Sequence, residues 1–170
     1  MPNSINMDAE TVTAATARAK NRTGKYLTFS LSNESYGVDV LKVREIIRMP
    51  QITTMPNTPD YVDGIINLRG AVMPIISLRR RFGLCDTEHD HKSRILVMEL
   101  GEGATGFVVD SVAEVLRVSA AEIQPPPDIA QAGMVQECLS GVTNHADRLL
   151  IVLDLGRLFC GQEAQLLENF

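Results

Sequence analysis

The feature that most restricts the fold of this chain is an internal duplication. The segment Gly64–Asn67 recurs as Gly141–Asn144, 77 positions later (64 to 141), and the register continues from Ile75–Leu78 to Val152–Leu155. Each copy therefore contains the same turn, strand and helix start. A chain duplicated in this way is predicted to fold as two related units.

A second spacing holds in the upstream part of the repeat. Gly37 and its neighbours match Gly106 and its neighbours 69 positions later (37 to 106), which indicates a longer loop further along the second half. Each half, roughly 25–85 and 93–160, is predicted to form a small barrel-like unit of about five strands. Neither half is large enough to be stable alone, because the fraction of surface that a domain buries on folding falls as the domain becomes smaller. We therefore expect two packed half-barrels with a groove between them.

Alternating apolar and polar residues, the period of half-buried strands, run through most of the chain after Gly24. A flexible tail is predicted for 1–24, where no apolar period is sustained. Short helices are predicted from the cap Ser77 to Gly83 and from Asp154 to about residue 168. The predicted strands cover 26–31, 36–40, 41–47 after a short turn, 62–68, 71–76, 95–100, 105–110, 112–118, 138–142 and 148–153. The glycines predicted to serve as structural turns are Gly37, Gly64, Gly70, Gly106 and Gly141.

Composition narrows the classes of function. Apolar residues make up 45% of the chain and charged residues 22%, the balance of a globular protein with a core. The net charge of −5 disfavours nucleic acid and anionic membranes as partners. Three widely spaced cysteines without a Cys-x-x-Cys pair predict a reducing compartment. Because no segment resembles a signal peptide or a membrane span, a cytoplasmic protein is predicted.

Catalytic and metal-binding motifs are not evident. His89 and His91 beside Asp86 are the only cluster of metal-ligand type, and a solvated polar loop is the favoured interpretation over a metal-dependent hydrolase. The run Arg79–Arg81 predicts a solvated helix face, because consecutive helical residues point in different directions. The carboxylates predicted to lie at the surface near strand ends are Asp39, Glu45, Asp110 and Glu114.

Two sets of residues admit both a structural and a binding role. Arg69, in a turn between two strands, is either a solvated turn arginine or a fixed fork for a partner's carboxylate or backbone. The second set could belong to the core, or it could form an apolar surface beside acidic residues on which a partner's apolar helix docks. It comprises Val43, Ile46, Ile47 and Val115.

Five separated motifs stand in a recognisable order: Tyr36–Ile46, Asn57–Pro59, Gly64–Gly70, Pro74–Arg79 and Gly106–Val112. In residues and spacing they closely resemble the CheW family of chemotaxis coupling proteins, and the likeness runs from about Lys25 to Phe159. The resemblance implies a CheW-like domain over 25–170. Its fold would be mainly β, with two intertwined five-stranded barrels like Src-homology-3 domains and short helices, including one at the C-terminus. This agrees with the duplication.

The resemblance also implies a function. Members of the family are non-enzymatic cytoplasmic adaptors that need no cofactor or metal and associate with membrane-anchored chemoreceptor arrays. This chain would join the cytoplasmic tips of methyl-accepting chemotaxis proteins to the regulatory domain of the histidine kinase CheA, and would be monomeric alone. The alternative from another class is a small-barrel protein that binds a small molecule in the groove between its barrels, near Arg69.

Site residues follow from the matching motifs. The residues implied to bind the receptor are Val43, Glu45, Arg69 and Val115. The residues implied to contact the kinase lie in two loops and are Asn57, Thr58, Pro59, Tyr61, Gln124, Asp128 and Ile129. The long tail and the loop at 86–92 depart from the common form of the family without touching these motifs.

Overall fold

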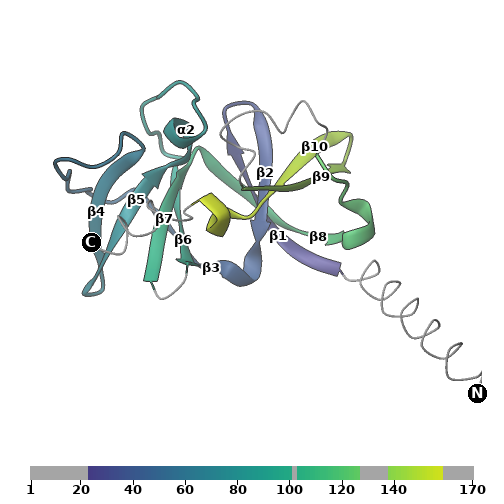
Figure 1. The fold of residues 1–170 in the computed structure, drawn as a ribbon, viewed down its shortest axis with the longest axis horizontal. Helices are drawn as coiled ribbons and strands as arrows, with labels where there is room; N and C mark the ends of the chain where they lie inside the picture. The colour runs from purple at the N-terminus through teal and green to yellow at the C-terminus, as the bar shows by residue number, and fades with distance from the viewer. Residues whose placement is uncertain (1–22, 101–102, 127–137, 159–170) are drawn as a thin grey trace, which may run out of the picture.

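The structure is a computed structural model, and it describes residues 23–100, 103–126 and 138–158. In this part of the chain the strands form two five-stranded sheets that lie side by side (Figure 1). The first sheet contains β1 (Thr23–Leu31), β2 (Glu34–Asp39), β8 (Ser111–Ser119), β9 (Leu139–His145) and β10 (Arg148–Leu153). The second contains β3 (Val43–Arg48), β4 (Val62–Leu68), β5 (Ala71–Ser77), β6 (Arg94–Leu100) and β7 (Gly103–Val109).

The two sheets have the same architecture. Their strand orders are β8-β1-β2-β10-β9 and β3-β6-β7-β5-β4, which coincide when β1 to β5 are matched with β6 to β10. The central parallel pairs also share their register, since Val152 lies opposite Gly37 in the first sheet and Ile75 lies opposite Gly106 in the second. The spacings of 77 and 69 positions in the sequence therefore correspond to equivalent places in the two sheets.

The halves of the sequence do not coincide with the sheets, which corrects the expectation that each half forms its own five-stranded unit. The first sheet takes β1 and β2 from the first half and β8 to β10 from the second, and the second sheet takes the remaining strands. The chain thus exchanges strands between the two barrels, which are intertwined as the family resemblance implies. Neither half would have a complete sheet without the other.

Packing of the core reinforces this exchange. The larger of two apolar clusters combines buried side chains from both sheets, such as Phe29 and Val38 from the first and Ile76 and Phe107 from the second. A smaller cluster, which includes Ile75 and Ile95, lies within the second sheet. Because burying apolar surface is the main favourable term in folding, the shared cluster makes the two sheets one stability unit.

Close approach of the backbone explains two of the repeated glycines. Thr53 forms two backbone hydrogen bonds with Ile65 across β4, and Gln124 forms the equivalent pair with Val142 across β9. A Cβ atom on Gly64 would lie 2.1 Å from the carbonyl oxygen of Thr53, and one on Gly141 would lie 2.7 Å from that of Gln124. Both distances are too short for a side chain.

Helices are short, as predicted. Ser77 caps α2 (Leu78–Arg81) by accepting a hydrogen bond from the backbone N–H of Arg80, and single 3-10 turns occur at η1 (Val40–Lys42), η2 (Ala120–Glu122) and η5 (Leu155–Leu158). The remainder of the predicted C-terminal helix, and residues 1–22 of the predicted tail, lie outside the described residues; β1 already begins at Thr23. Within the described part, no helix has the length and apolar character needed to cross a membrane.

Candidate interaction site

The turn between β4 and β5 fixes the direction of Arg69. Arg69 and Gly70 have positive φ angles of 53° and 87°, as a type I′ hairpin turn requires, and Gly70 N donates to Asn67 Oδ1 at 2.9 Å. The repeat preserves this geometry, because Ala146 and Asp147 have φ angles of 50° and 62° between β9 and β10. The two turns match in backbone, but only the first presents a guanidinium.

Glu45 and Arg69 are brought together. On β3 exposed and half-buried side chains alternate, and Glu45 lies on the half-buried face. Arg69 Nη2 lies 2.9 Å from Glu45 Oε2, with 76% of the Arg69 side chain exposed against 21% of Glu45. Glu45 therefore serves as a partly covered anchor, and most of the guanidinium remains open to solvent. The sequence predicts a surface carboxylate at Glu45 and gives no sign of this ion pair.

The second carboxylate oxygen of Glu45 is unusual. Oε1 is buried and accepts no hydrogen bond from any residue that the structure describes. A buried acceptor without a donor costs free energy, more so when it carries charge. The Glu45–Arg69 pair is consequently not a fully satisfied structural ion pair.

The aliphatic residues fall into two groups. Val43 and Ile47 are half-buried and pack against the two cores, whereas Ile46 and Val115 are 42% and 48% exposed. Val115 lies on β8 in the first sheet, apart from the sheet that carries Glu45 and Arg69. Ile46 matches Val115 at the 69-position spacing (46 to 115), so the two exposed side chains occupy equivalent strands of the two sheets.

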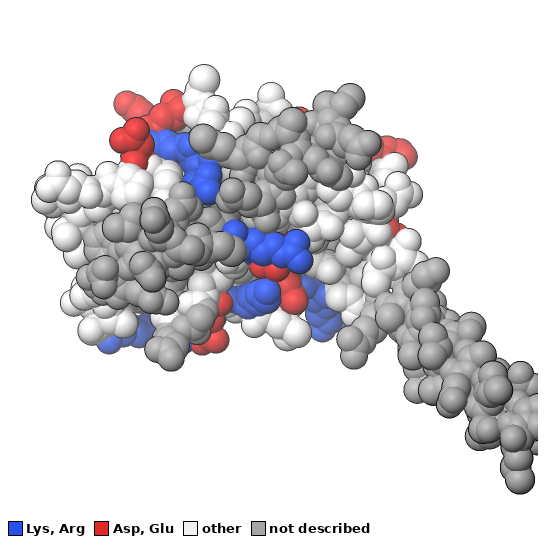
Figure 2. All heavy atoms as spheres, viewed as in Figure 1, with Lys and Arg blue, Asp and Glu red and all other residues white. Residues whose placement is uncertain are grey.

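Charges of both signs are mixed on the face shown in Figure 2, where blue and red side chains adjoin one another. Asp154 carries two basic neighbours, Lys42 and Arg157, each at 3.5 Å, and Arg44 pairs with Glu99. Such paired exposed charges add little stability but do set which partner charges fit.

The arginine run after β5 is not a solvated helix face, which corrects the prediction. Arg79 forms a two-pronged ion pair with Asp110, with Nε–Oδ1 and Nη2–Oδ2 distances of 2.8 and 2.6 Å. Arg80 binds Asp86, and Arg81 is buried with its guanidinium over the ring of Tyr61. Their divergent directions let each of the three serve a different neighbour.

Asp110 is predicted to make the stability of the fold depend on pH. Burial raises the pKa of this carboxyl, but hydrogen bonds from Arg79 and from the backbone N–H of Ser32 outweigh it and hold the pKa below its ordinary value of 3.8. A carboxyl with a lowered pKa in the folded state stabilises the fold above its ordinary pKa, and this contribution is lost as the pH falls through the folded-state pKa. We expect wild type to melt above Asp110→Asn at about pH 6 and the difference to shrink below about pH 4. Thermal melts across this range measure it, and a gap that widened in acid would contradict it.

The described residues implied to contact the kinase lie before β4 and at the bridge from Gln124 to β9. Asn57 is exposed with a φ of 61°, and Thr58 and Pro59 are half-buried in the loop that precedes β4. Tyr61 packs against the larger core and accepts a hydrogen bond from Ser77 N through its carbonyl oxygen. Gln124 is exposed, and its backbone N–H and C=O both form hydrogen bonds with Val142. Asp128 and Ile129 lie outside the described residues.

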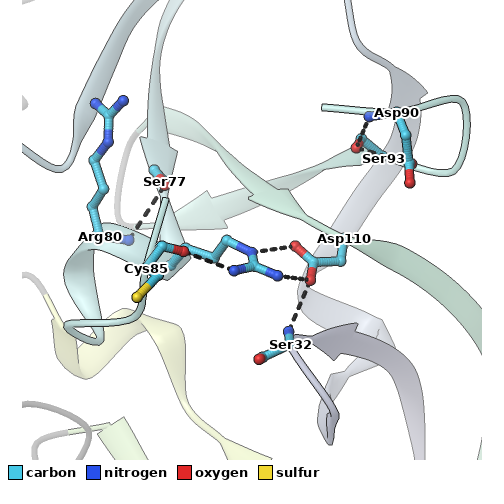
Figure 3. A network of polar contacts seen from close by, with 8 residues as sticks. Ser32, Ser77, Arg80, Cys85, Asp90, Ser93 and Asp110 are labelled. Atoms are coloured by element: carbon cyan, nitrogen blue, oxygen red, sulfur yellow. Dashed lines mark hydrogen bonds and ion pairs between the residues drawn. The ribbon is translucent and has the colours of Figure 1, made fainter. Parts of the chain in front are cut away.

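A cavity of about 220 Å³ lies beside Asp110. Its lining includes Arg79, Asp86, His89 and Asp90, and Arg69 is not part of it. Figure 3 shows Asp110 facing Ser32 at this place, with Asp90 and Ser93 in the neighbouring loop. In the described part of the chain, no three His, Cys, Asp or Glu side chains converge as a metal site would require. Asp86, a candidate metal ligand by its place beside His89 and His91 in the sequence, binds Arg80.

Two duplicated sheets exchange strands around a shared core, and their outer strands carry paired charges and isolated exposed aliphatic residues. This architecture defines a class of small double-barrel protein. The chain belongs to the CheW family. A family model described as a CheW-like domain matches residues 25–163. The match spans both sheets and leaves out only the first two residues of the described fold.

Similar proteins agree with this assignment. The chemotaxis protein CheW of Klebsiella aerogenes is 39% identical over 85% of this chain and 87% of its own length. The chemotaxis protein CheW of Treponema pallidum is 34% identical over 84% of this chain and 86% of its own length. The crystal structure of the scaffolding protein TtCheW from Thermoanaerobacter tengcongensis is similar with a TM-score of 0.75 and 34% identity, and the match covers 84% of this chain and 91% of that one.

Proposed function

We propose that this chain is a non-enzymatic chemotaxis adaptor that joins the cytoplasmic tips of methyl-accepting chemoreceptors to the regulatory domain of the histidine kinase CheA. Family membership and the names of the relatives support a chemotaxis scaffold. The choice of receptor and kinase as partners follows from the family resemblance. In this role the protein supplies two binding surfaces and no chemical step.

The observation that carries the proposal is the Glu45–Arg69 pair. The exposed guanidinium retains donors that can bind a carboxylate or a carbonyl of a partner. The buried Oε1 of Glu45 would gain a hydrogen bond if a partner's donor reached it when Arg69 moves. We call Val43, Glu45, Arg69 and Val115 the receptor surface, and a helical hairpin with an apolar stripe and flanking polar groups would suit it.

The kinase would contact the ends of the barrels. The loop before β4, with Asn57, Thr58, Pro59 and Tyr61, and the equivalent loop around Gln124 are the proposed contacts, together with Asp128 and Ile129. The described residues of these two segments adjoin different sheets and include none of the receptor surface, so both partners could bind one molecule at once. Simultaneous binding is what an adaptor requires.

Titration calorimetry tests the proposal. The full chain is titrated against the CheA regulatory domain and, separately, against a receptor-tip hairpin, each at two salt concentrations. We expect one-to-one binding to each protein at about 1 μM or tighter, with metal ions and nucleotides giving no heat. Correctly folded partners that gave no heat would overturn the proposal and leave only the fold assigned.

The small-molecule alternative gains no support from the geometry. It needs a cavity with converging polar groups near Arg69, and the cavity beside Asp110 lies elsewhere. At about 220 Å³ that cavity is also smaller than the roughly 300–1,000 Å³ of ordinary ligand sites.

A further inference from the structure

The chain passes between the two sheets at two places in the described fold. The first crossing is η1, which leads from β2 in the first sheet to β3 in the second. The second is Asp110, the single residue between β7 in the second sheet and β8 in the first. The relative orientation of the sheets therefore depends on how the chain is held at these points.

Asp110 is held from both sides of its crossing. Its carboxylate accepts two hydrogen bonds from Arg79, which follows β5 in the second sheet. The same carboxylate accepts a 2.8 Å hydrogen bond from Ser32 N in the β1–β2 turn, and the Asp110 backbone N–H donates to Ser30 O on β1 at 3.0 Å. Figure 3 shows the Asp110 carboxylate directed at Ser32 on one side and toward the segment that carries Cys85 on the other. One side chain thus links the two sheets.

The other crossing has a weaker counterpart with reversed charges. Lys42 of η1 lies 3.5 Å from Asp154, which precedes η5 after β10. About half of the Lys42 side chain is exposed, whereas the Arg79 side chain is only 16% exposed. A two-pronged, sheltered Arg–carboxylate pair fixes geometry far better than an exposed lysine contact. The Arg79–Asp110 pair is therefore the stronger of the two links.

Each crossing leads directly into a strand of the receptor surface. β3, which carries Val43 and Glu45, follows η1, and β8, which carries Val115, follows Asp110. Val115 lies in one sheet and the Glu45–Arg69 pair in the other, so their separation changes if the sheets turn relative to each other. A rigid partner helix can contact both only at one separation.

We propose that Arg79 and Asp110 are positioning residues, whose ion pair holds the two sheets in the orientation that lets Val115 and the Glu45–Arg69 pair bind the same receptor hairpin. This inference rests on the proposed function. Neither residue belongs to the receptor surface, and both act through the placement of β8.

Arg79→Lys and Asp110→Asn test the link, with Arg80→Lys as the matched control. Arg80 lies on the same helix and also binds a carboxylate with two nitrogens. Its described partners are Asp86 in the loop before β6, Asp63 on β4 and the carbonyl oxygen of Asp60, and none of these belongs to a strand of the first sheet. Calorimetry against the receptor hairpin is expected to show a loss of about tenfold for the two test variants, within the range for coupled sites. The control is expected to bind as wild type does. If Asp110→Asn fails to fold, the conservative Arg79→Lys carries the test alone.

A distance measurement separates positioning from mere stability. Val72 on β5 and Leu149 on β10 are both exposed and occupy equivalent places in the two sheets, so cysteines there can carry spin labels once Cys85 and Cys160 are replaced by serine. We expect a broader distance distribution in Arg79→Lys than in Arg80→Lys at a temperature where both are folded. If Arg79→Lys and Arg80→Lys bind the hairpin with equal affinity and give distance distributions of equal width, this inference is wrong and the proposed function still stands. A wild type with no affinity for the hairpin would overturn the proposed function, and the inference with it.

Discussion

Replacing Gly64 by alanine is expected to lower the free energy of unfolding by about 3 kcal/mol or more, from overpacking and backbone strain together. The new Cβ would lie 2.1 Å from the carbonyl oxygen of Thr53 and 2.8 Å from its carbonyl carbon. Thr53 cannot easily retreat, because its backbone N–H and C=O both bond Ile65 at 2.9 Å. Gly64 also has a φ of +149°, which side chains rarely adopt. Urea unfolding followed by circular dichroism gives the measurement.

Gly70→Ala is the matched control. Gly70 also has a positive φ, +87°, but a Cβ there would meet nothing within 4 Å. Its replacement should therefore cost only the backbone strain, about 1 kcal/mol. Equal losses for the two variants would show that the close approach of Thr53 contributes nothing, and would remove the explanation offered here for the repeated glycine.

Much of the fold follows from the sequence, because alternation and repetition are local signals. The period of two predicts most strands, and the repeat predicts that Gly37 and Gly106 occupy equivalent places, as the shared register of the parallel pairs confirms. Strand exchange could not be derived in this way. Alternation says which side chains face inward but not which strand lies alongside, so the residues alone indicated two separate halves. Only the family resemblance implied that the barrels are intertwined.

In the site too, contacts between neighbours in sequence could be predicted, and contacts between residues distant in sequence could not. The turn at Arg69 was predicted, since it depends on four consecutive residues. The environment of Asp110 was not, because Arg79 lies 31 residues away in sequence and meets it only once β6 and β7 have brought the chain back beside α2. The neighbours of a charged residue in sequence do not reveal a distant ion-pair partner, so such a residue is predicted to be exposed to solvent. The buried ring contact of Arg81 was missed for the same reason.

Reversing the charge of Arg69 should strongly weaken receptor binding while leaving the fold intact. In Arg69→Glu two carboxylates would face each other at the edge of β3, and the donors proposed for the partner would be absent. Truncating a charged contact at the centre of an interface commonly costs 2 kcal/mol or more, so we expect a loss of affinity of about thirtyfold or greater. The melting temperature should change little, because the Arg69 side chain is mostly exposed and an ion pair to an exposed side chain contributes roughly 0–1 kcal/mol. Calorimetry against the receptor-tip hairpin, with a thermal melt, measures both.

The repeat supplies the control for this experiment. Ala146 has the same backbone conformation in the equivalent turn of the first sheet, so Ala146→Glu introduces a carboxylate in matching geometry but away from Glu45. If binding depends on the Glu45–Arg69 pair, this variant should bind the hairpin as wild type does. The double variant Glu45→Arg with Arg69→Glu restores the ion pair with its two charges exchanged. It should remain folded but bind the hairpin poorly, because binding depends on which charge is exposed to the partner and not only on the presence of a pair. Equal losses in Arg69→Glu and Ala146→Glu would attribute the effect to net charge and would exclude Arg69 as a specific contact.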